Sequence, residues 1–302
     1  GEIFVAGIME HIEEAGIHSG DSACSLPPYS VSKETQNKII EWVSKIANEI
    51  NVVGLMNTQL AIKDKKIYVL EVNPRASRTV PFVAKSKGIP VAKIAAKVMV
   101  GENLNSILND YKINELKNFN VKESVFPFNK FDGVDLILGP EMKSTGEVMG
   151  IDETFLSSYI KSQIACGNIL PSKGTVFISI DNDNKKFIIE IAQKLKELDF
   201  NLLATKGTAE YLNSNNIKTK IVNKVKEGNP HVVDSLINNE IQLVINTTKT
   251  QSSIRDSYSI RRTSLMYNIP YYTTIAGAKV AVDAIEHMKT QEFTIKSLQT
   301  IN

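Results

Sequence analysis

The sequence predicts an α/β protein, in which an antiparallel sheet with packed helices is followed by a doubly wound parallel sheet. Two observations predict this fold class. Residues 57–73 are typical of a β-hairpin, because two apolar, β-branched stretches flank the short polar turn Asp64-Lys65-Lys66. From Gly174 onwards, strand-like stretches alternate strictly with helix-like stretches, which is the pattern of parallel strands connected by helices.

The first third of the chain supplies the elements around the hairpin. Residues 3–5 are predicted to form a strand, and Ser32 is a suitable cap for the long helix that follows. That helix has one apolar face, which is expected to cover a sheet: Ile39, Ile40, Val43, Ile46, Ala47 and Ile50. After the hairpin, a helix over 82–87 ends at Gly88, and a second helix occupies 90–101.

The rest of the chain is divided into a connector and the parallel sheet. Residues 120–150 are rich in glycine and proline but carry too many apolar residues for a flexible linker, so we predict an ordered connector. The predicted domains are 1–105, 106–171 (the connector) and 172–302. The predicted strands of the last domain are 175–180, 201–204, 219–222, 242–246 and one around Tyr271. The predicted helices are 185–198, one from Thr208, 231–238, 254–267 and 277–288.

Composition limits the partners of the protein. Its 302 residues include 35 Lys and Arg against 33 Asp and Glu, so no charge excess favours nucleic acid or an acidic membrane. No apolar run is long enough to span a bilayer. Cys24 and Cys166 have no metal-type spacing and fit a reducing cytoplasm, where we expect the protein. The chain opens directly in the strand-like segment, which favours a fragment or one piece of a split protein.

The hairpin is predicted to gather polar side chains at one end. A three-residue turn would pair Lys63 with Ile67 and Gln59 with Glu71. Because side chains alternate between the two faces of a strand, Glu71 and Asn73 then project together beside Gln59. The alternative is a solvated, merely polar strand end.

Two arginines follow this cluster directly. Pro74 lacks an N–H and ends the ladder, and Arg75 and Arg78 come next. One carboxylate, two amide oxygens and two guanidinium groups are suited to a Mg²⁺-triphosphate, because the oxygens are hard metal ligands and the guanidinium groups donate to phosphates.

The predicted parallel sheet has its own polar edge. Residues 205–208 follow its second strand and 246–248 follow its fourth, and ligands of such sheets bind at the carboxyl ends of the strands. Hydroxyls, an amide and helix N-termini suit a phosphate, with Lys185 and Lys224 as cations. Thr208 alone is equally well explained as a helix cap.

Three segments carry a family resemblance: MEHIEEAGIHSGDSACSLPP at 9–28, EVNPRASRTVPF at 71–82 and FNKFDGVDLILGPEMKSTGEVMG at 128–150. They closely resemble the large subunit of carbamoyl phosphate synthetase. Other ATP-grasp enzymes, such as biotin carboxylase, share only the short Glu-x-Asn-Pro-Arg core. The resemblance covers the whole chain. It implies an α+β, partial ATP-grasp subdomain, the end of the second such unit, followed by a Rossmann-like regulatory domain of the methylglyoxal synthase-like fold.

The resemblance implies an ATP site and a reaction. ATP would phosphorylate carbamate to carbamoyl phosphate, as in a glutamine-hydrolysing ligase of pyrimidine and arginine biosynthesis. The implied metals are Mg²⁺ or Mn²⁺, with K⁺ as a further candidate cation. The implied metal ligands are Gln59, Glu71 and Asn73. The implied catalytic residues are Arg78, Glu71 and Asn73, and the implied ATP-binding residues are His18, Ser19, Gln59 and Glu71.

The resemblance also implies two effector sites. UMP, as inhibitor, or IMP would bind at Lys185, Thr205, Thr208, Lys224, Asn246 and Thr248. Ornithine, as activator, would bind at Glu13, Asp21, Glu123, Tyr271 and Thr273. The implied protein partners are the remainder of the large subunit and the small glutaminase subunit, in an oligomer of the full enzyme. The phosphate-covering subdomain of an ATP-grasp site is absent, so we expect the chain alone to be inactive.

Two other functions are compatible with parts of the sequence. A free-standing nucleotide-binding regulatory module would use the parallel sheet and leave the hairpin without a catalytic role. A methylglyoxal synthase would share the C-terminal fold, but that family uses a catalytic Asp and His in its strand-end loops. Residues 205–208 and 246–248 contain neither residue type.

Overall fold

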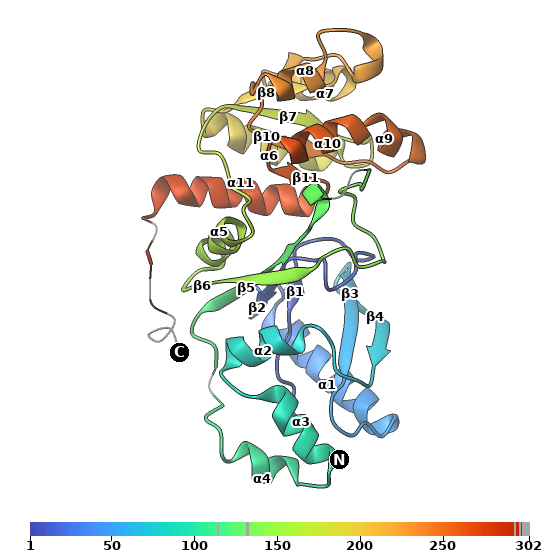
Figure 1. Cartoon of the computed structure of the whole chain (residues 1–302), viewed down its shortest axis with the longest axis vertical. Helices are drawn as coiled ribbons and strands as arrows, with labels where there is room; N and C mark the ends of the chain where they lie inside the picture. The colour runs from blue at the N-terminus through green and yellow to red at the C-terminus, as the bar shows by residue number, and fades with distance from the viewer. Residues whose placement is uncertain (114, 131–132, 293, 296, 298–302) are drawn as a thin grey trace.

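The computed structural model describes residues 1–113, 115–130, 133–292, 294–295 and 297, and it stacks the elements in layers along its long axis (Figure 1). A five-stranded parallel sheet with its helices lies at one end, and a four-stranded antiparallel sheet lies in the middle. The hairpin and the first helices form the other end. Among the residues described, every helix is too short or too polar to span a bilayer.

The middle sheet joins distant parts of the chain. Its strands, in the order β1-β2-β5-β6, are Glu10–His11, Cys24–Leu26, Phe119–Val125 and Gly146–Asp152. All neighbours are antiparallel. The strand predicted at 3–5 is wrong, because these residues pair with no described strand and the first ladder begins at Glu10, opposite Ser25. The predicted domain boundaries stay predictions.

A helix packs tightly on this sheet. Helix α5, Phe155–Ala165, begins at the cap Thr154 and lies across β5 and β6. Gly150 on β6 allows the close approach, since a Cβ there would lie 2.0 Å from the Ser158 carbonyl oxygen. No side chain fits at that distance, so the glycine sets the spacing between helix and sheet.

The hairpin forms with a shorter turn than predicted. Its strands β3 and β4 are Asn57–Lys63 and Lys66–Asn73. The turn has two residues, and Lys63 pairs with Lys66, so the predicted three-residue turn is wrong. Asp64 and Lys65 have φ values of 51° and 62°, as a type I′ turn requires. Its backbone twist matches that of the two strands.

The predicted pairs at the open end of the hairpin are nevertheless present. Gln59 lies opposite Glu71, and Asn57 lies opposite Asn73. The register shifts between Gln59 and Leu60, where a bulge adds one residue to β4. The bulge restores the register that the shorter turn would have shifted.

Four helices flank the hairpin in the sequence: α1, Lys33–Glu49; α2, Val80–Lys87; α3, Val91–Met99; and α4, Leu104–Leu108. Ser32 caps α1 as predicted, accepting from the Thr35 N–H. Of the predicted apolar face only Ile39 and Ala47 are buried, and Ile40 is 40% exposed. The face is incompletely covered because α1, β3 and the N-terminal segment line a groove of about 1,250 Å³.

The parallel sheet is confirmed. Its order is β11-β10-β7-β8-β9, and every neighbouring pair is parallel. The strands are β7, Thr175–Ser179; β8, Asn201–Ala204; β9, Lys220–Ile221; β10, Leu243–Asn246; and β11, Tyr271–Tyr272. The helices are α6, Lys185–Glu197; α7, Lys206–Ser214; α8, Val232–Ile237; α9, Gln251–Asp256; α10, Tyr258–Met266; and α11, Ile275–Thr290. Two short 3₁₀ turns are η1, Phe128–Lys130, and η2, Val225–Glu227.

Several predicted helix boundaries differ from the structure: α2 and α11 begin two residues before the predicted start. Helix α7 begins two residues earlier than predicted, directly after Thr205. The helix predicted over 254–267 is divided at Ser257 into α9 and α10. The Ser257 hydroxyl donates to the Ser253 carbonyl at 2.7 Å, a side-chain bond that competes with regular helix geometry.

Candidate functional site

The hairpin places its polar cluster as the pairing requires. Asn73 donates from Nδ2 to Glu71 Oε1 at 2.7 Å, and Gln59 lies directly opposite Glu71 on the same face. This contact uses neither the Asn73 side-chain oxygen nor Glu71 Oε2. The cluster therefore offers a carboxylate and two amide oxygens, which fit a hard divalent cation. Among the described residues there is no group of three His, Cys, Asp or Glu that could hold a metal.

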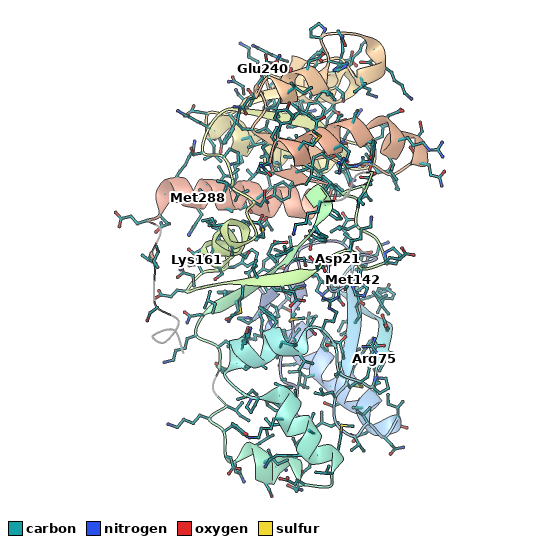
Figure 2. The ribbon with its side chains drawn as sticks, viewed as in Figure 1. Asp21, Arg75, Met142, Lys161, Glu240 and Met288 are labelled. Atoms are coloured by element: carbon teal, nitrogen blue, oxygen red, sulfur yellow. The ribbon has the colours of Figure 1, made fainter. Side chains whose placement is uncertain are left out.

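The two arginines after the hairpin point in different directions. Arg75 donates to the Ala76 carbonyl at 3.0 Å and is exposed. The Arg78 guanidinium contacts the Met142 thioether, in the segment between β5 and β6. Figure 2 shows Arg75 beside the hairpin and Met142 near the middle of the molecule.

The loop that carries His18 and Ser19 is held in place by the middle sheet. The Gly20 carbonyl accepts from Lys122 Nζ and from the hydroxyls of Ser124 and Ser144. His18 Nδ1 accepts from the Gly20 N–H at 3.0 Å. Ser19 and Gln59, two of the predicted ATP-binding residues, both line the groove of about 1,250 Å³.

Of the predicted ornithine-binding residues, Glu13 and Glu123 come together. Glu13 accepts from the Ala23 N–H at 2.8 Å, and Glu123 accepts from Gln163 Nε2. Burial, and then the charge of Glu123, raise the pKa of Glu13 to about 8. Burial likewise raises the pKa of Glu123 to about 7, although a hydrogen bond from the Ser124 N–H opposes the shift.

Asp21 has a different position. Its carboxylate accepts from the N–H groups of Lys143 and Ser144 at 2.8 and 2.9 Å. Asp21 is 1% exposed, and Figure 2 shows it close to Met142. Both carboxylate oxygens therefore hold the segment between β5 and β6.

The Tyr272 side chain lies towards the acid pair, and the place of Tyr271 in an ornithine site stays a prediction. The Tyr272 hydroxyl lies 3.2 Å from the Tyr159 hydroxyl and accepts from Asn168 Nδ2. Burial, and to a lesser extent the Glu123 charge, raise the pKa of Tyr272. Tyr271 packs on the opposite face of the sheet, because adjacent strand residues alternate. Thr273 follows β11 directly. The sequence shows two adjacent tyrosines, which must lie on opposite faces of the strand, but it does not indicate which of them faces the acid pair.

The end of the parallel sheet gathers hydroxyl groups. Thr208 Oγ1 accepts from the Ile180 N–H at 3.2 Å, and the Thr205 and Ser179 hydroxyls are 3.4 Å apart. Lys185 Nζ lies 3.7 Å from where a Cβ of Gly207 would be. Three of the predicted nucleotide-binding residues, Lys185, Thr205 and Thr208, therefore lie together.

The remaining predicted nucleotide-binding residues lie at other strand ends. Asn246 ends β10 and is buried, Thr248 follows it, and Lys224 is exposed before η2. Within the predicted loop 246–248, the Thr247 hydroxyl donates to Asp181 at 2.7 Å. The sequence reasoning missed Ser179, which could have been found, since the carboxyl ends of all parallel strands meet at one edge of the sheet.

Comparison with known proteins identifies relatives of both parts. Residues 1–107 match the family model described as carbamoyl-phosphate synthase L chain, ATP binding domain, and residues 187–273 match the MGS-like domain. The carbamoyl phosphate synthase large chains of Myxococcus xanthus and Archaeoglobus fulgidus are each 50% identical over 299 residues, which is 99% of this chain and 28% of theirs. That of Pseudomonas putida is 51% identical over 302 residues, 100% of this chain and 28% of its own.

Two solved structures are more distantly similar. The methylglyoxal synthase of Elizabethkingia anophelis is 18% identical with a TM-score of 0.30, over 37% of this chain and 79% of its own. The ADP complex of N5-carboxyaminoimidazole ribonucleotide synthetase is 17% identical with a TM-score of 0.39, over 52% of this chain and 43% of its own. Neither likeness carries an argument about function.

Proposed function

We propose that this chain, which belongs to the family of carbamoyl phosphate synthase large chains, carries two sites of such an enzyme. These are one side of an ATP site and a regulatory nucleotide site. The chain spans about 28% of the length of these relatives. The proposed reaction is phosphorylation of carbamate by ATP, in a glutamine-dependent cytoplasmic ligase of pyrimidine and arginine biosynthesis. Its proposed partners are the remainder of the large chain and a glutaminase subunit.

The observation that carries the ATP site is the cluster at the open end of the hairpin. Glu71 and Asn73 lie on one face with Gln59, whose side chain also lines the groove that contains Ser19. These oxygens would hold Mg²⁺ or Mn²⁺ bound to ATP, and the metal would supply positive charge next to the phosphates.

Arg78 would donate to the transferring phosphoryl group, because a guanidinium group is suited to phosphate oxygens. In the structure its partner is the Met142 thioether, a weak acceptor, so little holds the guanidinium away from a phosphate. The positive charge of Arg78 would offset the negative charge that spreads over the phosphoryl oxygens during transfer.

The surroundings of the hairpin support a covering partner. In the described part of the chain, β3 and β4 pair only with each other. Ile62, Tyr68 and Leu70 on these strands are 44%, 47% and 51% exposed. We propose that the remainder of the large chain covers this surface and completes the ATP site.

The regulatory proposal rests on the parallel sheet and on the acid pair. Lys185, Thr205 and Thr208 would hold the phosphate of UMP or IMP, because hydroxyls, a cation and a helix N-terminus are suited to a dianion. Glu13 and Glu123 would bind the ammonium groups of ornithine, and these cations would favour the ionised carboxylates.

A free-standing regulatory module is the second candidate function. It is favoured by one observation: the clustered hydroxyls at the strand ends belong to a single sheet, whereas the hairpin cluster is open on one side. This candidate binds the nucleotide but needs no carboxylate at position 71.

The test uses the complete large chain and follows ATP formation from ADP and carbamoyl phosphate, the reverse of the proposed reaction. We expect Glu71→Gln to lower the rate about 100-fold or more, since it removes the one carboxylate of the metal cluster. The control is Lys63→Gln, an exposed residue next to the turn of the same hairpin. Full activity of Glu71→Gln, with nucleotide binding intact, would exclude the ATP site and leave the regulatory module.

A further inference from the structure

One segment contacts both the loop that carries His18 and helix α10 of the parallel-sheet part. Residues 133–145, here named the bridging segment, precede β6 and lie between the parallel sheet and the hairpin end of the molecule (Figure 1). The bridging segment contacts the loop of His18 and Asp21 at one end and helix α10 at the other.

The contacts on the ATP side use backbone groups of the bridging segment. The His18 N–H donates to the Gly139 carbonyl at 2.8 Å. The N–H groups of Lys143 and Ser144 donate to the buried Asp21 carboxylate. Because these bonds tie the bridging segment to both His18 and Asp21, we expect a displacement of the segment to move the loop that presents His18.

The contact on the regulatory side is an ion pair in which the Arg261 side chain is buried and the Asp135 side chain is 26% exposed. Arg261 on α10 is 1% exposed, and its Nε and Nη2 donate to the two oxygens of Asp135. Its other donors reach the Ser257 hydroxyl at 2.6 Å and the Ile254 carbonyl at 2.8 Å. A bidentate guanidinium–carboxylate pair fixes the direction of both side chains, so Asp135 is held against α10.

Two unpartnered polar groups lie next to this pair. The Tyr271 hydroxyl and Asn246 Nδ2 are buried and make no hydrogen bond of good geometry among the described residues. Burial raises the pKa of Tyr271, and the nearby Arg261 and Asn246 side chains oppose the rise, so both lie close to the hydroxyl. An unpaired buried donor is costly, and a ligand that engages Asn246 changes the balance of partners around Arg261.

We propose that Asp135 and Arg261 are positioning residues, through which nucleotide binding at Asn246 shifts the bridging segment and with it the loop of His18 and Asp21. This inference rests on the proposed nucleotide site. The proposal compares the nucleotide-free and the nucleotide-bound arrangement. They differ in whether Arg261 is shared between Asp135 and the groups at Asn246 and Tyr271. Coupling of two sites requires such a differential contact.

A second route joins the same two parts of the molecule. The Tyr159 and Tyr272 hydroxyls lie 3.2 Å apart, and Asn168 connects Tyr272 to Gln163 and so to Glu123. This route does not pass through the bridging segment. It therefore provides the alternative against which the proposal is tested.

The experiment measures amide hydrogen exchange in this 302-residue chain with and without UMP, together with UMP affinity by calorimetry. In the wild type we expect UMP to change the exchange rates of the His18 and Ser144 amides at least fivefold. In Asp135→Asn we expect UMP affinity within threefold of wild type but no change at these two amides. Asp135→Glu keeps a carboxylate and is expected to retain the change.

Three controls keep the outcomes distinct. The double variant Asp135→Leu/Arg261→Met removes the pair without leaving a buried charge, in case Asp135→Asn does not fold. Glu190→Gln removes an exposed ion pair with Lys279, distant from the bridging segment, and should behave as wild type. Tyr272→Phe removes the hydroxyl that both Tyr159 and Asn168 contact, so it interrupts the second route and should also retain the change.

Each outcome has one meaning. No UMP binding by folded wild type refutes the proposed nucleotide site and, with it, this inference. UMP binding without a change at His18 and Ser144 leaves the nucleotide site standing and overturns the inference. The inference is equally overturned if the change survives in both Asp135→Asn and the double variant, or if Tyr272→Phe abolishes it.

Discussion

The acid pair of Glu13 and Glu123 predicts an unusual titration, which the variant Glu123→Gln tests. Glu123 has its pKa raised from 4.5 to about 7, first by burial. The difference of about 2.5 pKa units corresponds to about 3 kcal/mol in favour of the neutral carboxyl in the folded protein. Because both residues keep some solvent exposure, this figure is an upper bound.

The sign of the pH dependence follows from the raised pKa. Below about pH 4.5 the carboxyl is neutral in folded and unfolded chains alike, so its contribution to stability is fully present. As the pH rises from about 4.5 to about 7, the unfolded chain ionises first, and the free energy of unfolding falls by up to about 3 kcal/mol. Glu123→Gln removes the part of this fall in the free energy of unfolding that comes from Glu123. It also lowers the pKa of Glu13, because the Glu123 charge contributes to the raised pKa of Glu13.

The assay is a carbon-13 NMR titration of the chain labelled at the glutamate δ-carboxyl. We expect two resonances with midpoints near 7 and 8 in the wild type, and ornithine should lower both because cations favour the carboxylates. Glu123→Gln should lose the first and lower the second. The control Glu34→Gln removes an exposed carboxyl whose pKa Lys38 lowers, and should leave both unchanged. Wild-type midpoints all near 4.5 would refute the description of a buried acid pair.

Two further predictions concern packing and the turn. Gly150→Ala should lower the free energy of unfolding by about 3 kcal/mol or more, because the added Cβ would meet the backbone of α5. Gly146→Ala, on the same strand, has room for its Cβ and is the control. Urea unfolding compares the two variants, and equal stability would contradict the close approach of α5 to Gly150. Lys65→Gly should stabilise the hairpin by up to about 1 kcal/mol, because Lys65 has a left-handed φ of 62°, a conformation that glycine adopts without steric strain. Slower amide exchange in β3 and β4 of the variant would confirm this prediction. Faster exchange would count against the type I′ turn.

Local patterns predicted the elements better than their partners. The five parallel strands could be predicted, because apolar runs that alternate with helices are compatible with few folds other than a parallel sheet. Residues 3–5 have the composition of a strand, but a strand also needs a neighbour, which only the tertiary structure supplies. The two-residue turn was missed because Asp64 and Lys65 are unusual in the left-handed conformation.

The candidate sites show the same limit. Strand periodicity alone placed Gln59, Glu71 and Asn73 on one face. In the structure this pairing is kept because a bulge compensates for the shorter turn. The pairing of Arg261 with Asp135, 126 positions apart, has no local signal in the sequence. Strand alternation put Tyr271 and Tyr272 on opposite faces, but only the packing decides which one faces Glu123.

The most direct test of the proposed regulatory function is a calorimetric titration of this chain with UMP, in the wild type and in Thr205→Ala. IMP and ornithine serve as comparison ligands. Thr205 is buried at the end of β8 beside Ser179, and its loss should weaken UMP binding about tenfold, as expected when a hydrogen bond to a charged phosphate is removed. Saturable binding to the wild type that weakens in the variant is the predicted result. A folded wild-type chain that binds no nucleotide would contradict the account.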